Sequence, residues 1–211
     1  MRKQLLISFM SISVLAISQD KGFVSGTVAF STETISSDGY PLDLTNTSVL
    51  FGPAIGFNLG TSNVVGLALN VQQTTNETAY FGSSGAVKSI TKRSLIEVAP
   101  FFRRMMSVGD KCSIYGQVLF AVGAGSMNTE IDNSASDTEA DISNVRVAIG
   151  PGIFYHFSDH WAASADWGAL GYSNYKETEK GNYGDIETTT TGLELRVDPG
   201  AITFALNYVW K

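Results

Sequence analysis

The sequence predicts an all-β protein, an eight-stranded antiparallel up-and-down transmembrane β-barrel. Two observations predict this fold: strict alternation of apolar and small or polar residues, and connections that alternate in length. The alternation is clearest at the chain's end, where the apolar positions are Ile202, Phe204, Leu206, Tyr208 and Trp210. A strand points successive side chains to opposite faces, so one face here is apolar and ends in two aromatic residues. A strand between lipid and a polar lumen has this pattern.

Seven earlier segments show the same period of two. In chain order they are Phe23–Phe30, Ser48–Phe57, Val64–Gln72, Leu95–Met106, Ser113–Ser126, Asn144–Phe157 and Trp161–Leu170. The eighth is less regular, because Leu193, Leu195 and Val197 use odd positions whereas residues from 202 onward use even ones. The intervening Asp198-Pro-Gly200 predicts a bulge, so we interpret residues 190–210 as one long bent strand. A separate hairpin in the loop is the alternative.

The connections between these segments alternate between long and short. The long ones are Thr32–Thr47, Gln73–Ser94, Met127–Ser143 and Gly171 to about Thr191, and the short ones are Asn58–Asn63, Ser107–Cys112 and Ser158–His160. A soluble β-sandwich also has alternating strands, but it has no reason for this regularity. Short periplasmic turns and long extracellular loops are typical of outer-membrane barrels, and an even strand count places both termini in the periplasm.

The N-terminus has the features of a secretory signal peptide over residues 1–18. Basic Arg2 and Lys3 precede the apolar stretch Leu5–Ile17, and small Ala16 and Ser18 stand before the expected cleavage point. An N-terminal core helix is the alternative. We therefore expect export of a single barrel domain, residues 19–211, to the outer membrane of a Gram-negative cell. The formal charge of −6 and pI near 4.8 argue against nucleic acid as a partner.

The residues between the apolar positions predict a polar lumen, and the aromatic residues predict a membrane girdle. Eight strands enclose just enough space for side chains, so charges there require partners. We expect a lumen cluster that plugs the barrel, with an ion or proton path as the alternative; its members are Glu97, Arg103, Arg146 and Asp166. Aromatic residues gather beside the short turns, Phe101 among them, and the predicted periplasmic girdle is Phe57, Phe102, Tyr155, Phe157, Trp161, Tyr208 and Trp210.

Several short motifs resemble those of the outer-membrane β-barrel family common in Bacteroidetes. They are Pro53-Ala-Ile-Gly-Phe57 with Asn63-Val-Val-Gly66, Ala99-Pro-Phe-Phe-Arg103, Gly152-Ile-Phe-Tyr155 with Ser158-Asp-His-Trp161, and Leu170-Gly-Tyr172. The sequence departs from the family pattern at Arg104 and Met105, where aromatic residues are expected. The resemblance implies an eight-stranded barrel similar to OmpA-type and OmpX-type domains. It implies no ligand, because a fold does not fix a function.

The favoured function is a non-enzymatic, structural or surface-interaction role through four extracellular loops. The third and fourth loops are acidic, with Glu130, Asp132, Asp137, Glu139, Asp141, Glu177, Glu179, Asp185 and Glu187, which we interpret as a solvated surface rather than a calcium site. His156 and Ser158 resemble the His-x-Ser of lipid A deacylases, so a small lipid-modifying enzyme is an alternative, and a narrow channel is another. We expect a monomer without cofactor or metal, whose partners are outer-membrane lipid, the barrel-insertion machinery and surface partners of the loops.

Overall fold

The computed structural model describes residues 22–36, 43–82, 85–131, 138–180, 184–196 and 202–210, so the predicted signal peptide lies outside it. Within these ranges there is no helix of the length and hydropathy that crossing a membrane requires. All the regular structure described is β-strand. The strands are β1 (Gly22–Ser36), β2 (Asp43–Leu59), β3 (Asn63–Gly82), β4 (Gly85–Ser107), β5 (Cys112–Ile131), β6 (Thr138–His156), β7 (Trp161–Asp166), β8 (Ala169–Glu179), β9 (Ile186–Arg196) and β10 (Thr203–Trp210).

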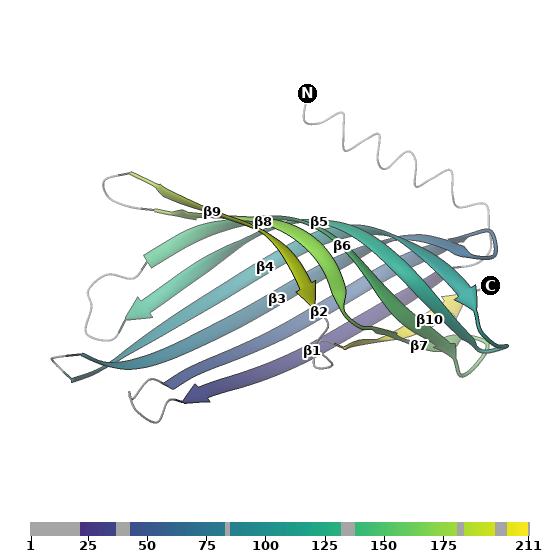
Figure 1. Cartoon of the computed structure of the whole chain (residues 1–211), viewed down its shortest axis with the longest axis horizontal. Coiled ribbons are helices and arrows are strands. Elements are labelled where there is room, and N and C mark those ends of the chain that lie inside the picture. The colour runs from purple at the N-terminus through teal and green to yellow at the C-terminus, as the bar shows by residue number, and fades with distance from the viewer. Residues whose placement is uncertain are drawn as a thin grey trace.

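The strands pair into a closed antiparallel circuit. Each of β1 to β5 pairs with the next strand, β6 pairs with β7, β7 with β10, and β10 returns to β1. Figure 1 shows these strands running obliquely around one long axis, with β1 beside β10. The predicted all-β, antiparallel, up-and-down order is therefore confirmed. The circuit encloses an interior, called the lumen, which holds the candidate site.

The predicted number of eight strands is wrong, because the described residues form ten. The predicted seventh strand is broken at Gly168, whose φ of +66° is a left-handed conformation that favours glycine. The break shifts the alternation by one residue: Trp161 and Trp167 are exposed before it, and Leu170 and Tyr172 after it. Ala169, predicted on the same face as Trp167, lines the lumen instead. The two pieces, β7 and β8, pair with successive parts of β6.

The predicted eighth strand is also two strands. β9 pairs with β8 in a hairpin, and β10 lies between β7 and β1. Leu193 and Leu195 are exposed on β9, whereas the even residues Phe204 and Leu206 are exposed on β10, as the sequence pattern indicates. The predicted bulge falls on residues 197–201, which lie outside the described residues. The alternative, a hairpin within the fourth loop, matches β8 and β9.

Most of the predicted extracellular loops are strands. β3 and β4 pair without interruption from Asn63↔Arg104 to Gly82↔Gly85, far beyond the predicted loop boundaries at Gln73 and Ser94. The prediction ended each strand where its outward face stopped being apolar, but threonine-rich segments also favour extended structure. Ion pairs join neighbouring strands in these extensions: Lys88 Nζ lies 2.7 Å from Glu77 Oε2, and Lys92 Nζ lies 3.0 Å from Glu130 Oε1.

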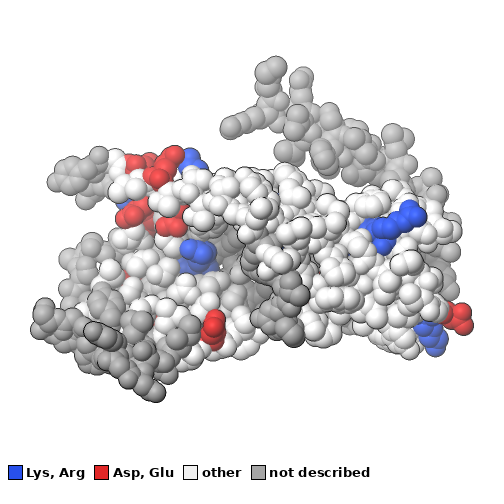
Figure 2. Space-filling model, viewed as in Figure 1, with Lys and Arg blue, Asp and Glu red and all other residues white. Residues whose placement is uncertain are grey.

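The outer surface is apolar around the middle of the circuit. On the face seen in Figure 2, charged side chains gather toward the two ends and leave a largely uncharged band between them. Of the predicted girdle residues, Phe102, Tyr155, Phe157, Trp161 and Tyr208 are exposed. Phe57 and Trp210 are half-buried and pack edge to face with ring centroids 6.1 Å apart. All of them lie in or near the short turns, and their contact with headgroups stays a prediction.

The double variant Tyr208→Ala/Trp210→Ala should impair barrel closure. Tyr208 stands opposite Val24 on β1 and Trp161 on β7, so it lies in the strand that closes the circuit. We expect less protein with heat-modifiable gel mobility and a lower membrane yield, because an unclosed edge leaves backbone groups unpaired in lipid. Phe30→Ala, which removes an outward ring from β1 beyond its pairing with β10, is the control. Unchanged mobility in the double variant would contradict the prediction.

Candidate lumen site

The four charged residues predicted for the lumen point inward, but they form two clusters rather than one. Alternation along β4 brings Glu97 and Arg103 to the same face, six residues apart. Each of these two is only 6% exposed. Glu97 meets Arg146, and Arg103 lies near Asp166 without an ion pair in the described part of the chain. Their proposed role as a plug stays a prediction.

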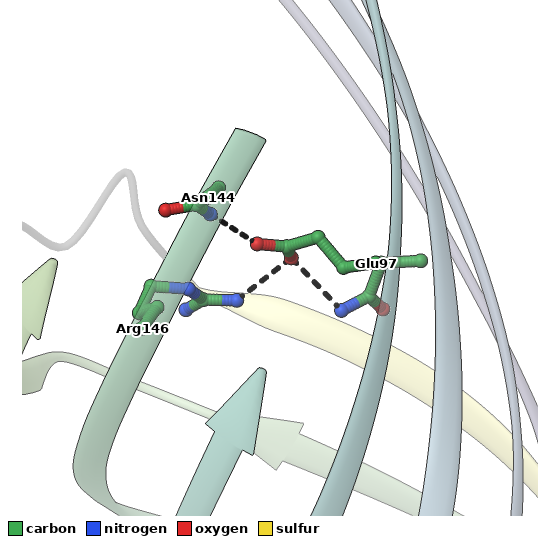
Figure 3. Close-up of polar contacts among 4 residues, drawn as sticks. Glu97, Asn144 and Arg146 are labelled. Atoms are coloured by element: carbon green, nitrogen blue, oxygen red, sulfur yellow. Dashed lines mark hydrogen bonds and ion pairs between the residues drawn. The ribbon is translucent and has the colours of Figure 1, made fainter. Parts of the chain in front are cut away.

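The first cluster centres on the carboxylate of Glu97. Asn144 Nδ2 donates to Glu97 Oε1 at 2.6 Å, and Arg146 Nη2 donates to Oε2 at 3.1 Å. Figure 3 shows these side chains approaching Glu97 from the facing strand. Asn70 Nδ2 on β3 makes a third, longer contact to Oε2 at 3.4 Å. A buried carboxylate requires such partners, because desolvation otherwise costs several kcal/mol. We call these four residues the Glu97 hub.

A glycine makes the Glu97 hub possible. Glu97 and Asn144 lie on β4 and β6, which are separated by β5, and Gly123 of β5 stands opposite both of them. A Cβ atom at Gly123 would approach Glu97 Cγ to 2.9 Å. The absent side chain therefore leaves the space in which the two polar groups meet. The hydrogen bonds tie β3, β4 and β6 together on the inner face of the wall.

The second cluster places a guanidinium among aromatic rings. Arg103 Nε and Nη2 donate to Gln117 Oε1 at 3.0 and 2.7 Å, and the guanidinium carbon lies 4.0 Å from the Tyr115 ring centroid. The Tyr115 hydroxyl donates to Asp166 Oδ1 at 2.8 Å. Arg103 Nη1 is buried and has no hydrogen-bond partner among the described residues. The arrangement thus holds a buried cation through a neutral amide and aromatic faces.

Aromatic side chains pack inside the lumen at the end near the short turns. Phe23, Phe101, Tyr115 and Phe154 are all buried, and Met105 and Val209 pack against the groups that they form. The rings of Phe23 on β1 and Phe154 on β6 have centroids 6.0 Å apart. We call this layer the aromatic floor. Phe101, which the sequence groups with the girdle aromatics beside the short turns, is instead buried inside the barrel, on the same strand face as Arg103.

Each of three floor rings lies over a glycine directly opposite it on the neighbouring strand. The pairs are Phe23↔Gly56, Phe101↔Gly66 and Tyr115↔Gly152. A Cβ at any of these glycines would collide with the ring. In so narrow a barrel, a large inward side chain thus requires a glycine opposite it on the neighbouring strand. Aromatic residues cover glycines in the same way in designed sheets.

A cavity of about 250 Å³ lies in the lumen. Phe101, Arg103 and Asp166 line it on the side of the aromatic floor, and Asn70 and Arg146 line it on the side of the Glu97 hub. Its wall also includes small residues near the strand break, namely Thr27, Gly168, Ala169, Thr203 and Ala205. This lumen cavity offers two guanidinium groups, a carboxylate and several hydroxyls. It can therefore bind a small polar group by charge-assisted hydrogen bonds.

His156 and Ser158 take part in local structure. Ser158 Oγ accepts hydrogen bonds from the backbone nitrogens of Trp161 at 3.0 Å and His160 at 3.4 Å, which stabilises the short turn. The His156 ring packs edge to face on Phe154, with centroids 5.0 Å apart. Within the described ranges, no group of three His, Cys, Asp or Glu residues could hold a metal ion.

The closed antiparallel circuit, its apolar exterior and its polar lumen define the class of membrane β-barrel proteins. The chain belongs to the outer membrane protein β-barrel domain family, whose model matches residues 4–208. The protein is therefore an outer-membrane β-barrel protein. The narrower Bacteroidetes type and the likeness to OmpA-type or OmpX-type barrels stay expectations.

Solved structures resemble the chain at low sequence identity. A major outer membrane protein from Thermus thermophilus is 9% identical, with a TM-score of 0.49, over 91% of this chain and all of that one. The Yersinia pestis attachment invasion locus protein Ail is 14% identical, with a TM-score of 0.39, over 91% of this chain and 99% of that one. OprG from Pseudomonas aeruginosa has the same identity and TM-score, over 91% and 96%. No curated relative matches the sequence.

Removing the carboxylate of Glu97 should destabilise the barrel strongly. Glu97→Ala leaves Arg146 and Asn144 without their acceptor, and breaking a buried pair costs about 3–5 kcal/mol, less where water enters. Urea unfolding of the refolded protein measures the loss. Glu130→Ala, which breaks the exposed ion pair with Lys92, is the matched control and should cost about 0–1 kcal/mol. Equal losses for the two variants would show that the Glu97 hub is not a structural centre.

A methyl group at Gly152 should disturb the aromatic floor. Gly152→Ala forces the Tyr115 ring to move, and overpacking of this kind costs about 1–3 kcal/mol. Gly116→Ala on β5 is the control, because a Cβ there meets no atom within 4 Å. Urea midpoints measure stability, and near-ultraviolet circular dichroism reports the tyrosine environment. If both variants unfold at the same midpoint, the pairing of ring and glycine contributes nothing.

Proposed function

We propose that the protein is a non-enzymatic outer-membrane protein that acts at the cell surface through its strand extensions. The observation that carries this proposal is the continuation of paired strands far beyond the apolar band. In β3 and β4, ten register pairs lie between Gln73↔Ser94 and Gly82↔Gly85. Such a ladder presents polar side chains from a defined backbone, which suits recognition of a partner better than a disordered loop does.

The extensions carry both signs of charge, with acidic groups in excess in the hairpin of β8 and β9. Lys176 Nζ lies 2.7 Å from Glu187 Oε1, and Lys180 Nζ lies 3.0 Å from Asp141 Oδ2. The hydrogen bond to Asp141 raises the pKa of Lys180. Glu139, Glu177, Glu179 and Asp185 add negative charge to the same region, and the predicted acidic residues Asp132 and Asp137 lie outside the described residues. A partner with a basic surface is the chemistry that this region favours.

Two features support a closed lumen over a channel. The Glu97 hub joins polar side chains of three nearby strands on the lumen face, and the aromatic floor occupies the end near the short turns. An ion crossing the barrel would have to displace the rings of the aromatic floor, and the hydrogen bonds of the Glu97 hub hold its charged groups in fixed positions. The four lumen residues accordingly have a structural role in this proposal, and the proton or ion path is disfavoured.

The lipid-modifying alternative is disfavoured by the roles of its two candidate residues. The Ser158 hydroxyl already accepts two backbone N–H groups of the turn, so it is held as a turn residue rather than as a nucleophile. Catalysis by a serine requires a base that takes its proton in the same geometry. The turn also belongs to the predicted periplasmic end, away from the outer leaflet.

Shortening the acidic hairpin should remove surface binding without affecting assembly. Thr178 stands opposite Glu187, so residues 179–186 can be replaced by Asn-Gly, which forms a two-residue hairpin turn. We expect cells with this variant to bind less to polylysine-coated glass, with unchanged heat-modifiable mobility. The matched control shortens β3 and β4 in the same way between Thr78 and Ser89. Undiminished binding by the first variant would contradict a role for the hairpin.

The orientation can be tested in a Cys112→Ser background. Thr189→Cys on β9 should react with a membrane-impermeant maleimide on intact cells, whereas Asp110→Cys in a short turn should react only after the outer membrane is permeabilised. The reverse labelling pattern would show that the barrel has the opposite orientation.

In the same cells, Ser158→Ala and His156→Ala should leave the mass spectrum of lipid A unchanged, since neither residue is assigned a catalytic role. A changed acylation pattern would support the enzyme instead.

A further inference from the structure

One outward position of β4 carries a positive charge in an otherwise apolar row. Phe102 and Met106 are outward and are 44% and 59% exposed. Between them stands Arg104, which is also exposed. The sequence departs from the family pattern at this residue, where an aromatic side chain is expected. A cation on the lipid face of a barrel is costly in the middle of the bilayer and tolerated near the headgroups. Arg104 therefore belongs at the headgroup level.

The guanidinium of Arg104 is held beside a short turn. Asn63, the first residue of β3, stands opposite Arg104, and Arg104 Nη1 donates to Asn63 Oδ1 at 2.9 Å. This neutral contact uses one nitrogen of a planar fork that carries N–H groups on all its nitrogens. Within the described ranges Arg104 forms no ion pair. An anion at the level of the short turns would complete its hydrogen bonding.

A glycine leaves a gap in the outer wall beside Arg104. Gly116 on β5 stands opposite Arg104 on β4 and opposite Pro151 on β6. It is exposed, and a Cβ there would meet no atom within 4 Å. We call this gap the Gly116 notch. Because neighbouring strands are about 4.8 Å apart, the notch has the width of a single hydrocarbon chain.

A pocket of about 600 Å³ adjoins the Gly116 notch on the side of the short turns. Arg104 lines it together with two apolar residues, Met106 and Ile114. Ile114 and Gly116 are successive residues on the outward face of β5, so the notch continues the pocket along the strand. Guanidinium and hydroxyl groups are donors that bind phosphate oxygens. The hydroxyl groups that line the pocket belong to Thr61, Ser62, Ser107 and Ser113.

We propose that this part of the outer wall binds one phospholipid of the leaflet at the short-turn end, with its phosphate on Arg104 and one acyl chain in the Gly116 notch. A phosphodiester supplies a negative charge and acceptor oxygens, which complement a guanidinium whose described partner is a neutral amide. The hydroxyl groups of the pocket contact the rest of the headgroup. This site is separate from the surface hairpin and from the lumen, so it and the proposed function can fail independently.

Gly26 on β1 provides a comparison within the same barrel. It is also outward and exposed, and a Cβ there would likewise meet no atom within 4 Å. Its cross-strand neighbours, however, are Pro53 and Leu206, which are uncharged. An acyl chain can lie at either glycine, but only at Gly116 does a guanidinium stand beside it to bind the phosphate.

Native mass spectrometry of the refolded protein, released from detergent micelles, tests the site. The probe is dioleoylphosphatidylglycerol, and the controls are dioleoylglycerol, which lacks the phosphate, and glycerol phosphate, which lacks the chains. The protein should retain one phosphatidylglycerol about tenfold more often than one dioleoylglycerol, because the diglyceride cannot form the charge-assisted hydrogen bond. Equal retention of the two lipids would overturn the proposal. So would displacement by glycerol phosphate as effective as displacement by a second phospholipid, since the site would then bind free phosphate.

Two pairs of variants test the guanidinium and the notch separately. Arg104→Gln should reduce retention of phosphatidylglycerol about tenfold, whereas Lys111→Gln, which removes the same charge from an exposed turn residue at the same end, should not. Gly116→Leu fills the notch and should also reduce retention, whereas Gly26→Leu should not. Heat-modifiable mobility verifies folding of each variant. Equal retention within either pair would overturn the proposal, and if Gly116→Leu does not fold, the Arg104 pair decides.

Discussion

The interior of the barrel is so narrow that large inward side chains and glycines must alternate across neighbouring strands. Gly56, Gly66 and Gly152 stand opposite aromatic rings, and Gly123 stands opposite two polar residues that meet above it. The same steric constraint therefore positions both the aromatic floor and the Glu97 hub. Because interior packing tolerates little change in volume, strand register and lumen chemistry are fixed together. The cavity is the space that these two layers leave between them.

The Glu97 hub and the aromatic floor stabilise their buried charges in different ways. Glu97 is stabilised by donors from two other strands, and this network resembles a conventional buried ion pair. Within the described part of the chain, Arg103 is held by Gln117 and by the faces of Phe23, Phe101 and Tyr115. The first cluster is satisfied by the protein itself. The second leaves one buried guanidinium nitrogen that no described residue accepts from.

The sequence predicted the features that depend on local alternation and failed where they depend on non-local pairing. Period two identified the strands' outward faces and the inward direction of Glu97 and Arg103. It could not show that Arg103 pairs with Gln117 rather than Asp166, since that choice depends on register and on which rings intervene. The aromatic floor was missed because Phe101 was judged by its position near a turn instead of by its parity. The strand extensions were missed because polar residues on both faces look like loop in sequence but still pair.

The two breaks near the C-terminus have a consequence for how this part of the chain can change. The outward residues have odd numbers in β7 but even numbers in β8. In the partner strands they have even numbers in β10 and odd numbers in β9. Outward residues therefore still pair with outward residues: Trp161 faces Tyr208, and Tyr172 faces Leu193. Each break shifts the alternation of inward and outward residues by one position. One break separates β7 from β8, and the other separates β9 from β10. Deleting a single residue at Gly168 would turn Leu170 and Tyr172 into the lumen while Leu193 and Leu195 stayed outside. Insertions and deletions in β7 to β10 are therefore confined to changes of two residues, or to single-residue changes made in both paired strands.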